Sequence, residues 1–280
     1  IASSKSLTNA FLNQNSNASP DVIQEVCSPC GQRRKFAVEF EFLSKVGEGS
    51  FGDVLCARHK LDGQCYAIKK IRKPGMSPHS IMNALREVHV LSSLPPHLNI
   101  LSYKSAWLED ACSSVYIQTE KLDSLLISSS EHIRRFVVDI ASALRYLHAS
   151  NLTHMDVKPS NVLVRKCAQR DSFDYVLIDF GLARKSDASL KEDTEGDARY
   201  LCPLRMELSC AEYVMYNKAE KLCAIDIFAL GVSAVELALK LVAERVETES
   251  DGLEVSKFLK SCKQQILSKA LNESKSKFLY

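Results

Sequence analysis

The sequence predicts an α+β fold, in which a small antiparallel sheet is followed by a mainly helical region. Residues 40–120 contain several short runs typical of strands, and Asp62-Gly63 between two of them favours a tight turn. From Glu131 to Leu147 the apolar residues instead recur at helical spacing. A chain of 280 residues can form one two-lobed domain or two small domains, and it is long enough to bury a substantial core.

The elements are expected in a definite order. Strands are predicted at 42–47, 52–58, 65–71, 100–107 and 115–120, and helices at 80–94, 131–147 and about 224–243. Pro95-Pro96 ends the first helix, and a hinge is expected at 120–123. The last helix is apolar, but it carries Asp226, Glu236 and Lys240, which are costly in lipid, so it is interpreted as a buried core helix.

Composition narrows the class of protein. Residues 1–35 are rich in Ser, Asn and Gln and are interpreted as a flexible extension. A formal net charge of +2 gives no electrostatic case for a nucleic-acid or membrane surface. Ten scattered cysteines indicate reduced thiols and an intracellular setting. Cys27 and Cys30 form a C-x-x-C pair, but no further ligands stand at zinc-finger spacing, so a linker with two free thiols is favoured.

Five short motifs carry chemistry, and they stand in one order along the chain. They are the glycine-rich run 47–54, Ala67-Ile68-Lys69, Glu87 on the first predicted helix, residues 154–161 with Asp156 and Asn161, and Asp179-Phe180-Gly181. A glycine-rich run alone is weak evidence, because glycine clusters also form ordinary turns. Together the motifs resemble the eukaryotic protein kinase catalytic domain.

That resemblance implies ATP and Mg²⁺ as cofactors and assigns a role to each motif. Asp156 would accept the proton of the substrate hydroxyl, Lys158 would neutralise the γ-phosphate, and Lys69 would grip the α- and β-phosphates while it pairs with Glu87. Asn161 and Asp179 would bind the metal. The nucleotide would contact a larger set, which comprises Val46, Gly47, Glu48, Gly49, Ser50, Phe51, Gly52, Val54, Ala67, Lys69, Thr119, Glu120, Leu122, Leu163 and Asp179. Leu91, Tyr103, His154 and Phe180 would form a spine of stacked side chains.

Within the kinases, the chain resembles the Wee family over about residues 38–240. The similarity rests on residues 61–69, 83–88, 154–161 and 195–201. It implies a monomer in the nucleus, with the cytoplasm also open, that phosphorylates a tyrosine of a cyclin-dependent kinase and so restrains entry into mitosis. It also implies an N-lobe over about 36–120 and a C-lobe over about 124–280, in which the late helices are expected to be missing.

The chain also departs from the family pattern. Phe180 stands where Wee kinases commonly have Leu, and Cys202-Pro203-Leu204 lacks the usual acid. Met155 replaces the arginine that grips a phosphorylated activation loop, and the loop instead carries fixed charge at Glu192, Asp193, Glu195 and Asp197. Two alternatives stay open, namely a serine/threonine kinase of the translation-initiation-factor group and a pseudokinase that acts as an interaction module.

Overall fold

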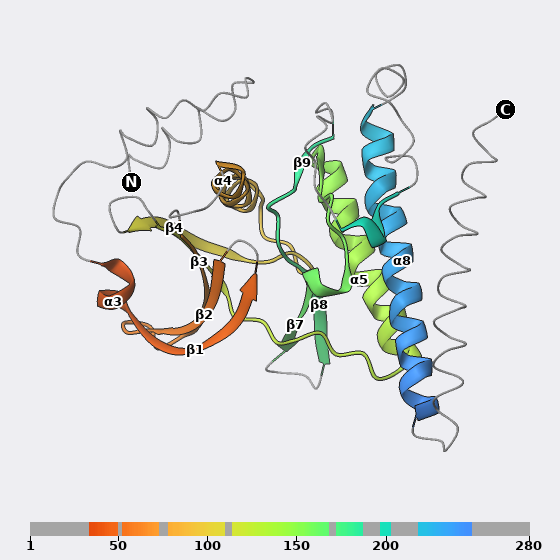
Figure 1. Cartoon of the computed structure of the whole chain (residues 1–280), viewed down its shortest axis with the longest axis horizontal. Coiled ribbons are helices and arrows are strands. Elements are labelled where there is room, and N and C mark those ends of the chain that lie inside the picture. Colours follow the sequence, from red (N-terminus) through yellow and green to blue (C-terminus); the bar gives the residue numbers. More distant parts are fainter. Residues whose placement is uncertain are drawn as a thin grey trace. The chain divides into compact units, whose positions relative to one another are not determined.

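The chain forms two compact units. The computed structural model of the protein describes residues 34–49, 52–72, 78–109, 114–167, 172–186, 197–202 and 218–247. The first unit comprises the chain up to Pro95 together with Ser102–Lys121, and the second comprises Pro96–Leu101 and the chain from Leu122 onward. The boundary after Lys121 lies inside the hinge expected at 120–123. The α+β, two-lobed fold class is therefore confirmed (Figure 1).

The first unit is built on a five-stranded antiparallel sheet with the order β1-β2-β3-β5-β4. Its strands are β1 (Phe40–Gly49), β2 (Gly52–His59), β3 (Cys65–Arg72), β4 (Tyr103–Glu109) and β5 (Ser114–Glu120). The helix α4 (Pro78–Ser93) connects β3 to β4. The predicted start of β4 at residue 100 was wrong. Ile100 forms an isolated parallel bridge with Leu177, and so it pairs outside this sheet.

Strand alternation separates the two faces of the sheet. One face packs a cluster of Phe40, Ala57, Ile68 and Tyr116. The other packs a cluster of Ile71, Val115 and Ile117 with Ala84 from α4. Because side chains alternate along a strand, Lys69 lies on the same face of β3 as Ile71, toward the face that α4 covers.

A short helix that the sequence did not predict precedes the sheet. Helix α3 (Lys35–Glu39) stacks Phe36 on Phe40, with ring centroids 5.9 Å apart, and on Tyr116 at 5.8 Å. Glu109, which is buried, accepts hydrogen bonds from the Phe36 backbone N at 2.7 Å and from Trp107 Nε1 at 2.8 Å. The first unit therefore includes Lys35, which the sequence analysis assigned to the flexible extension.

Two helices form the centre of the second unit. Helix α5 (Ser130–Ala149) lies beside α8 (Lys218–Glu247), as Figure 1 shows. Ser129 caps α5 by accepting a hydrogen bond from the His132 backbone N at 3.2 Å. The predicted apolar stripe is buried at Phe136, Ile140, Leu144 and Leu147. Residues 124–128, between the first unit and α5, contain no helix.

The second unit also contains two small two-stranded sheets and two 3-10 turns. Strand β6 (Leu152–Thr153) pairs with β9 (Arg184–Lys185), and β7 (Val162–Cys167) pairs with β8 (Ser172–Leu177). The turns are η1 (Pro159–Asn161) and η2 (Ala198–Tyr200). The β7–β8 hairpin pairs Val162 with Leu177, so the residues that precede β7 and follow β8 lie at the same end.

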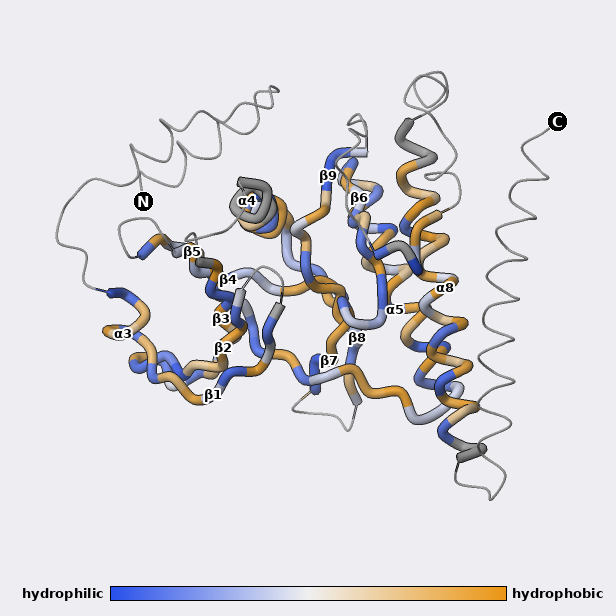
Figure 2. The backbone as a smooth tube through the Cα atoms, in the orientation of Figure 1, coloured by the Kyte–Doolittle hydropathy of each residue, from blue (hydrophilic) through white to orange (hydrophobic). Residues whose placement is uncertain are grey.

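Helix α8 is longer than the predicted range of 224–243. Its segment Leu222–Glu244 is long and apolar enough to cross a membrane by length and composition alone. Hydrophobic and hydrophilic residues follow one another in bands along it (Figure 2). Leu222, Ile225 and Leu237 are buried, and so is the charged Asp226. Only 39% of its most apolar window is buried, and Ile227 and Val242 are exposed, so the expected core helix is observed along one face of α8.

Candidate active site

Lys69 and Glu87 form the ion pair that the motifs predicted. Lys69 Nζ lies 2.6 Å from Glu87 Oε2, and only 4% of the Glu87 side chain is exposed. Lys69 is placed by β3 and Glu87 by α4, so the pair ties the helix to the sheet. Lys70 points to the opposite face, where its Nζ lies 4.9 Å from the centre of the Tyr116 ring. Strand alternation therefore distinguishes the two adjacent lysines, as predicted.

The glycine-rich run forms the hairpin between β1 and β2. Gly49 pairs with Gly52, and Ser50 and Phe51 at its tip lie outside the described residues. Gly52 has a φ of +139°, and a Cβ there would lie 2.1 Å from the Lys70 carbonyl oxygen. A side chain is therefore excluded at Gly52. At Gly47 an added Cβ would make only an ordinary contact of 3.7 Å with Val54.

The other residues expected to contact the nucleotide come from both units. Val54 pairs with Lys69 and Ala67 with Thr119, so the register places all four on one face of the sheet. Val46 and Glu48 are exposed on β1. Glu120 Oε1 accepts a hydrogen bond from the Ser102 backbone N at 2.7 Å. Leu122 and Leu163, which are half-buried, belong to the second unit.

Asp156 is the centre of a polar cluster in the second unit. Lys158 Nζ lies 3.0 Å from Asp156 Oδ1 and 2.8 Å from Oδ2. Asn161 Nδ2 donates to Asp156 Oδ2 at 2.7 Å and to the Asp156 backbone O at 2.8 Å. The turn η1 brings Asn161 back to Asp156. These contacts fix the orientation of a carboxylate that remains 12% exposed.

Asp179 follows β8, and a backbone hydrogen bond of the residue before it joins this segment to the cluster. The Ile178 backbone N donates to the Asn161 O at 3.0 Å, and Asp179 Oδ1 accepts from the Gly181 N at 3.4 Å. Asp179 has a φ of +61°, which is uncommon for a residue with a side chain. Such backbone strain concentrates at functional sites.

These residues fit a magnesium ion. Both hydrogen bonds from the Asn161 side chain to Asp156 are donated by Nδ2. The amide oxygen of Asn161 can therefore face a cation. Mg²⁺ is usually held by one or two carboxylates together with water and substrate phosphates. In the part of the chain that the structure describes, no three His, Cys, Asp or Glu side chains gather as a metal site. A Mg²⁺ ion held by Asn161 and Asp179 together with water and substrate phosphates would not need such a group.

A buried carboxylate holds the loop of residues 154–161, which carries Asp156 and is called the catalytic loop from here on. Asp226 on α8 is fully buried, and it accepts hydrogen bonds from the His154 N at 2.9 Å and from the Met155 N at 2.8 Å. It also lies 2.9 Å from His148 Nε2 on α5. The sequence analysis did not assign Asp226 a role. The available signal was its charge inside an apolar helix, which was used only against a membrane span.

The expected spine is present in parts. His154 and Phe180 are fully buried, with ring centroids 4.9 Å apart in an edge-on arrangement, and His154 Nε2 lies 3.0 Å from the Ile178 O. In the first unit Leu91 is buried and Tyr103 is half-buried. Burial raises the pKa of Tyr103. The contact between His154 and Phe180 therefore agrees with the resemblance, and the stacking of Leu91 on Tyr103 stays a prediction.

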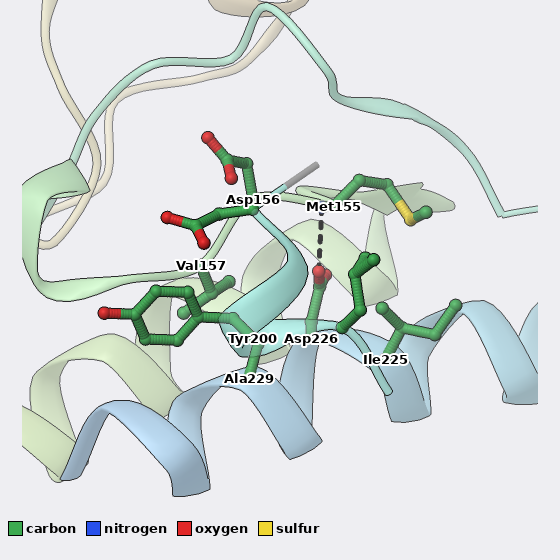
Figure 3. A pocket seen from close by; sticks show the side chains of 9 residues that line it. Met155, Asp156, Val157, Tyr200, Ile225, Asp226 and Ala229 are labelled. Atoms are coloured by element: carbon green, nitrogen blue, oxygen red, sulfur yellow. Dashed lines mark hydrogen bonds between the residues drawn. The ribbon is translucent and has the colours of Figure 1, made fainter. Parts of the chain in front are cut away.

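Next to Asp156 the second unit has a small pocket (Figure 3). Its lining residues come from the catalytic loop, from η2 and the residues beside it, and from α8: Met155, Asp156, Val157, Asp197, Tyr200, Leu201, Ile225, Asp226 and Ala229. Asp197 is held by Arg199, whose Nε and Nη2 donate to the two carboxylate oxygens at 3.0 and 2.7 Å. Tyr200 donates a hydrogen bond to Glu236 on α8. Glu192, Asp193, Glu195, Pro203 and Leu204 lie outside the described residues.

Known proteins match the chain over most of its length. A family model described as the protein kinase domain matches residues 40–278. Wee1-like protein kinase 1-A of Xenopus laevis is 32% identical over 228 residues, which covers 72% of this chain and 38% of that protein. Wee1-like protein kinase of Arabidopsis thaliana is 31% identical over 212 residues, with 72% and 39% covered.

A third relative is a kinase with a different name. The membrane-associated tyrosine- and threonine-specific cdc2-inhibitory kinase of Drosophila melanogaster is 33% identical over 208 residues, with 71% of this chain and 36% of that protein covered. The chain thus spans about a third of the length of the curated relatives it matches.

Proposed function

The chain belongs to the protein kinase family, with Wee-type kinases among its relatives, and on this premise we propose that it is an active Wee-type kinase. It transfers the γ-phosphate of ATP to a tyrosine of a cyclin-dependent kinase. The single observation that carries the proposal is the formed pair between Lys69 and Glu87 at 2.6 Å. A kinase needs this pair in place to position the nucleotide.

The residues of the second unit divide the work of the reaction. Asp156 accepts or orients the proton of the attacking hydroxyl, since the groups around it hold its carboxylate in one orientation. Lys158 brings a positive charge to the place where the transferred group develops negative charge. Asn161 and Asp179 would hold Mg²⁺. When bound, MgATP supplies the phosphoryl group and the metal charge that screens it.

The choice of acceptor rests on the relatives. Lys158 in the Asp156 loop follows the serine/threonine pattern, but the cdc2-inhibitory relatives are named as tyrosine- and threonine-specific. A tyrosine hydroxyl lies farther from the substrate backbone than a serine hydroxyl. The partner must therefore be a folded protein held by docking surfaces, and no nucleic-acid or membrane partner is proposed. From the resemblance to the Wee family we propose that the protein is a monomer that acts in the nucleus.

Radiolabel transfer from ATP tests the catalytic proposal. The wild-type chain should label a cyclin-dependent kinase, and Asp156→Asn should abolish transfer because the base is lost. Lys70→Met is the matched control, since Lys70 lies on the opposite face of β3 from Lys69. Lys69→Met should reduce transfer severely. Equal rates for wild type and Asp156→Asn would refute the catalytic assignment, and no transfer by the wild type would favour the pseudokinase.

Phosphosite mapping tests the acceptor. The folded cyclin-dependent kinase should carry the label on tyrosine and should be a far better substrate than a short peptide. Label confined to serine or threonine would instead support a kinase of the translation-initiation-factor group.

A further inference from the structure

The hairpin between β1 and β2 carries two carboxylates directly opposite each other. Glu48 pairs with Asp53 across the two strands, and this pair is the last one before the tip pair of Gly49 and Gly52. Like charges at directly opposite positions of neighbouring strands destabilise a sheet. The register therefore places a repulsive pair next to the tip of the glycine-rich hairpin.

One lysine offsets this repulsion. Lys45 Nζ lies 2.7 Å from Glu48 Oε2 and 2.7 Å from Asp53 Oδ1. Its hydrogen bonds to Asp53 and Glu48 raise the pKa of Lys45, so the ammonium stays charged at neutral pH. A single exposed ion pair adds little to stability, but one ammonium shared by two carboxylates forms a small network. These three residues form the Lys45 cluster.

The Lys45 cluster lies on the face of the hairpin that is turned away from the expected nucleotide. Gly47 pairs with Val54, and both belong to the expected nucleotide contacts. Because neighbouring positions of a strand alternate, the side chains of Glu48 and Asp53 lie on the other face, and only the backbone of Glu48 remains for the expected nucleotide contact. The cluster therefore acts on a nucleotide through the pairing of the hairpin and through its charge.

We propose that Lys45 is a positioning residue for the nucleotide, whose ammonium holds the two strands of the glycine-rich hairpin together near the tip and cancels carboxylate charge that would repel the phosphates of ATP. This inference rests on the proposed kinase function, in which the hairpin covers those phosphates. Without the Lys45 ammonium, two carboxylates would face each other beside the tip. A looser and more negative hairpin binds MgATP more weakly.

Nucleotide binding by the full chain is the first test, because it does not need catalysis. The Kd of the fluorescent analogue mant-ATP is measured with Mg²⁺ at low ionic strength. Lys45→Met should raise this Kd about threefold, and Lys45→Arg should restore most of the wild-type value because it keeps the charge. Lys45→Met combined with Asp53→Asn should also lower the Kd again, since that cluster has the same net charge as the wild-type cluster.

Arg58→Met is the matched control. Arg58 Nη1 lies 3.3 Å from Glu41 Oε2 and joins the same two strands, but at the end of the hairpin away from the tip. The variant also removes one exposed cation, and it should change the Kd by less than about 1.5-fold. Raising the salt concentration to about 0.5 M should shrink the effect of Lys45→Met, since exposed charges are screened.

Two further measurements separate positioning from a general loss of structure. In the transfer assay, Lys45→Met should raise the KM for MgATP and leave kcat within about twofold, because Asp156 and Lys158 belong to the second unit. Hydrogen exchange of the β1 and β2 amides, measured by mass spectrometry without nucleotide, tests the hairpin itself. Exchange should be faster in Lys45→Met and close to the wild-type rate in Lys45→Arg.

The outcomes separate this inference from the kinase function. An unchanged Kd or unchanged exchange in Lys45→Met, or a raised Kd that the added Asp53→Asn does not lower, would overturn the role of Lys45. An equal rise in Arg58→Met would overturn it as well, because any lost cation would then have the same effect. A wild type that binds mant-ATP without transferring phosphate, with the same order of Kd values, would overturn the proposed function and support the inference. A wild type that binds no nucleotide would overturn both.

Discussion

At the scale of single residues, the catalytic loop depends on one buried charge. Asp226 contributes no atom to the proposed chemistry, yet two backbone donors of the loop and the His148 ring converge on its carboxylate. Met155 has a φ of +69°, a conformation that costs free energy for a residue with a side chain. The hydrogen bond from the Met155 N to Asp226 helps to hold that conformation, and so the loop places Asp156 toward the pocket (Figure 3).

Replacing this charge should therefore destabilise the second unit. Asp226→Ala leaves buried donors without their acceptor, and we expect the free energy of unfolding to fall by about 3 kcal/mol. Urea denaturation followed by circular dichroism measures it. Glu244→Ala on the same helix is the control, because Glu244 is exposed and makes only a weak 3.9 Å pair with Lys240. A loss below about 1 kcal/mol in Asp226→Ala would contradict the supporting role.

At the scale of elements, the short helix α3 packs against one face of the first unit's sheet. Five residues cannot form a stable helix in isolation, so packing must hold it. Phe36 supplies that packing against Phe40 and Tyr116, and Lys35 lies with its Nζ 4.6 Å from the centre of the Trp107 ring. Glu109 accepts a hydrogen bond from the Phe36 N, a backbone donor in the first turn of α3.

Truncating the central side chain of α3 should loosen the sheet. Phe36→Ala should lower the stability of the first unit by about 1–2 kcal/mol, because it removes half-buried aromatic surface and two ring contacts. Thermal melting of the full chain would show the change as a lower midpoint. Val38→Ala on the same helix removes an exposed side chain and should change the midpoint little. Similar shifts for the two variants would mean that α3 is not docked through Phe36.

Residues 197–202, which follow the segment that carries the loop charges, are held by apolar packing as well as by hydrogen bonds. Met155 is buried in a cluster with Cys202, Leu222 and Ile225, and Leu182 and Phe228 pack against it. An arginine at this place would bind a phosphate on the loop, and methionine has no such group to offer. Apolar contacts do not depend on the phosphorylation state.

Activity should accordingly be independent of loop phosphorylation. Purified protein treated with phosphatase should keep its initial rate within about twofold, because Met155 packs into the cluster with or without a phosphate. Radiolabel transfer before and after treatment measures this rate. A collapse of the rate that autophosphorylation restores would show that a phosphate orders the loop after all.

At the scale of the whole molecule, the proposed nucleotide contacts are divided between the two units. Lys69 and Thr119 belong to the first, and Leu163, Asn161 and Asp179 belong to the second. A ligand that binds the folded chain and not the unfolded one stabilises the folded chain by an amount that grows with the logarithm of the ratio of ligand concentration to Kd.

MgATP should therefore raise the melting temperature of the full chain. At a concentration about a hundredfold above Kd the added stability is about 2.7 kcal/mol, which corresponds to several degrees. Asp156→Asn should keep this shift while losing transfer, because Asp156 serves the acceptor and not the nucleotide. EDTA should reduce the shift, since Asn161 and Asp179 would then lose the metal that links them to the phosphates. Loss of the shift in Asp156→Asn would place that residue in nucleotide binding.

The sequence by itself determined the motifs, the strands of the first unit apart from the start of β4, and the helices α4, α5 and α8. Strand alternation distinguished Lys69 from Lys70, and helical spacing placed Glu87 and the stripe of α5, because both periods are local properties of the backbone. Tertiary structure decided what local patterns cannot encode. The Asp226 contacts join residues 71–78 positions apart, and Glu109 reaches back 73 positions to Phe36. A buried hydrogen bond of this kind forms only when folding brings its two partners together. The residues next to each partner in the sequence do not predict it.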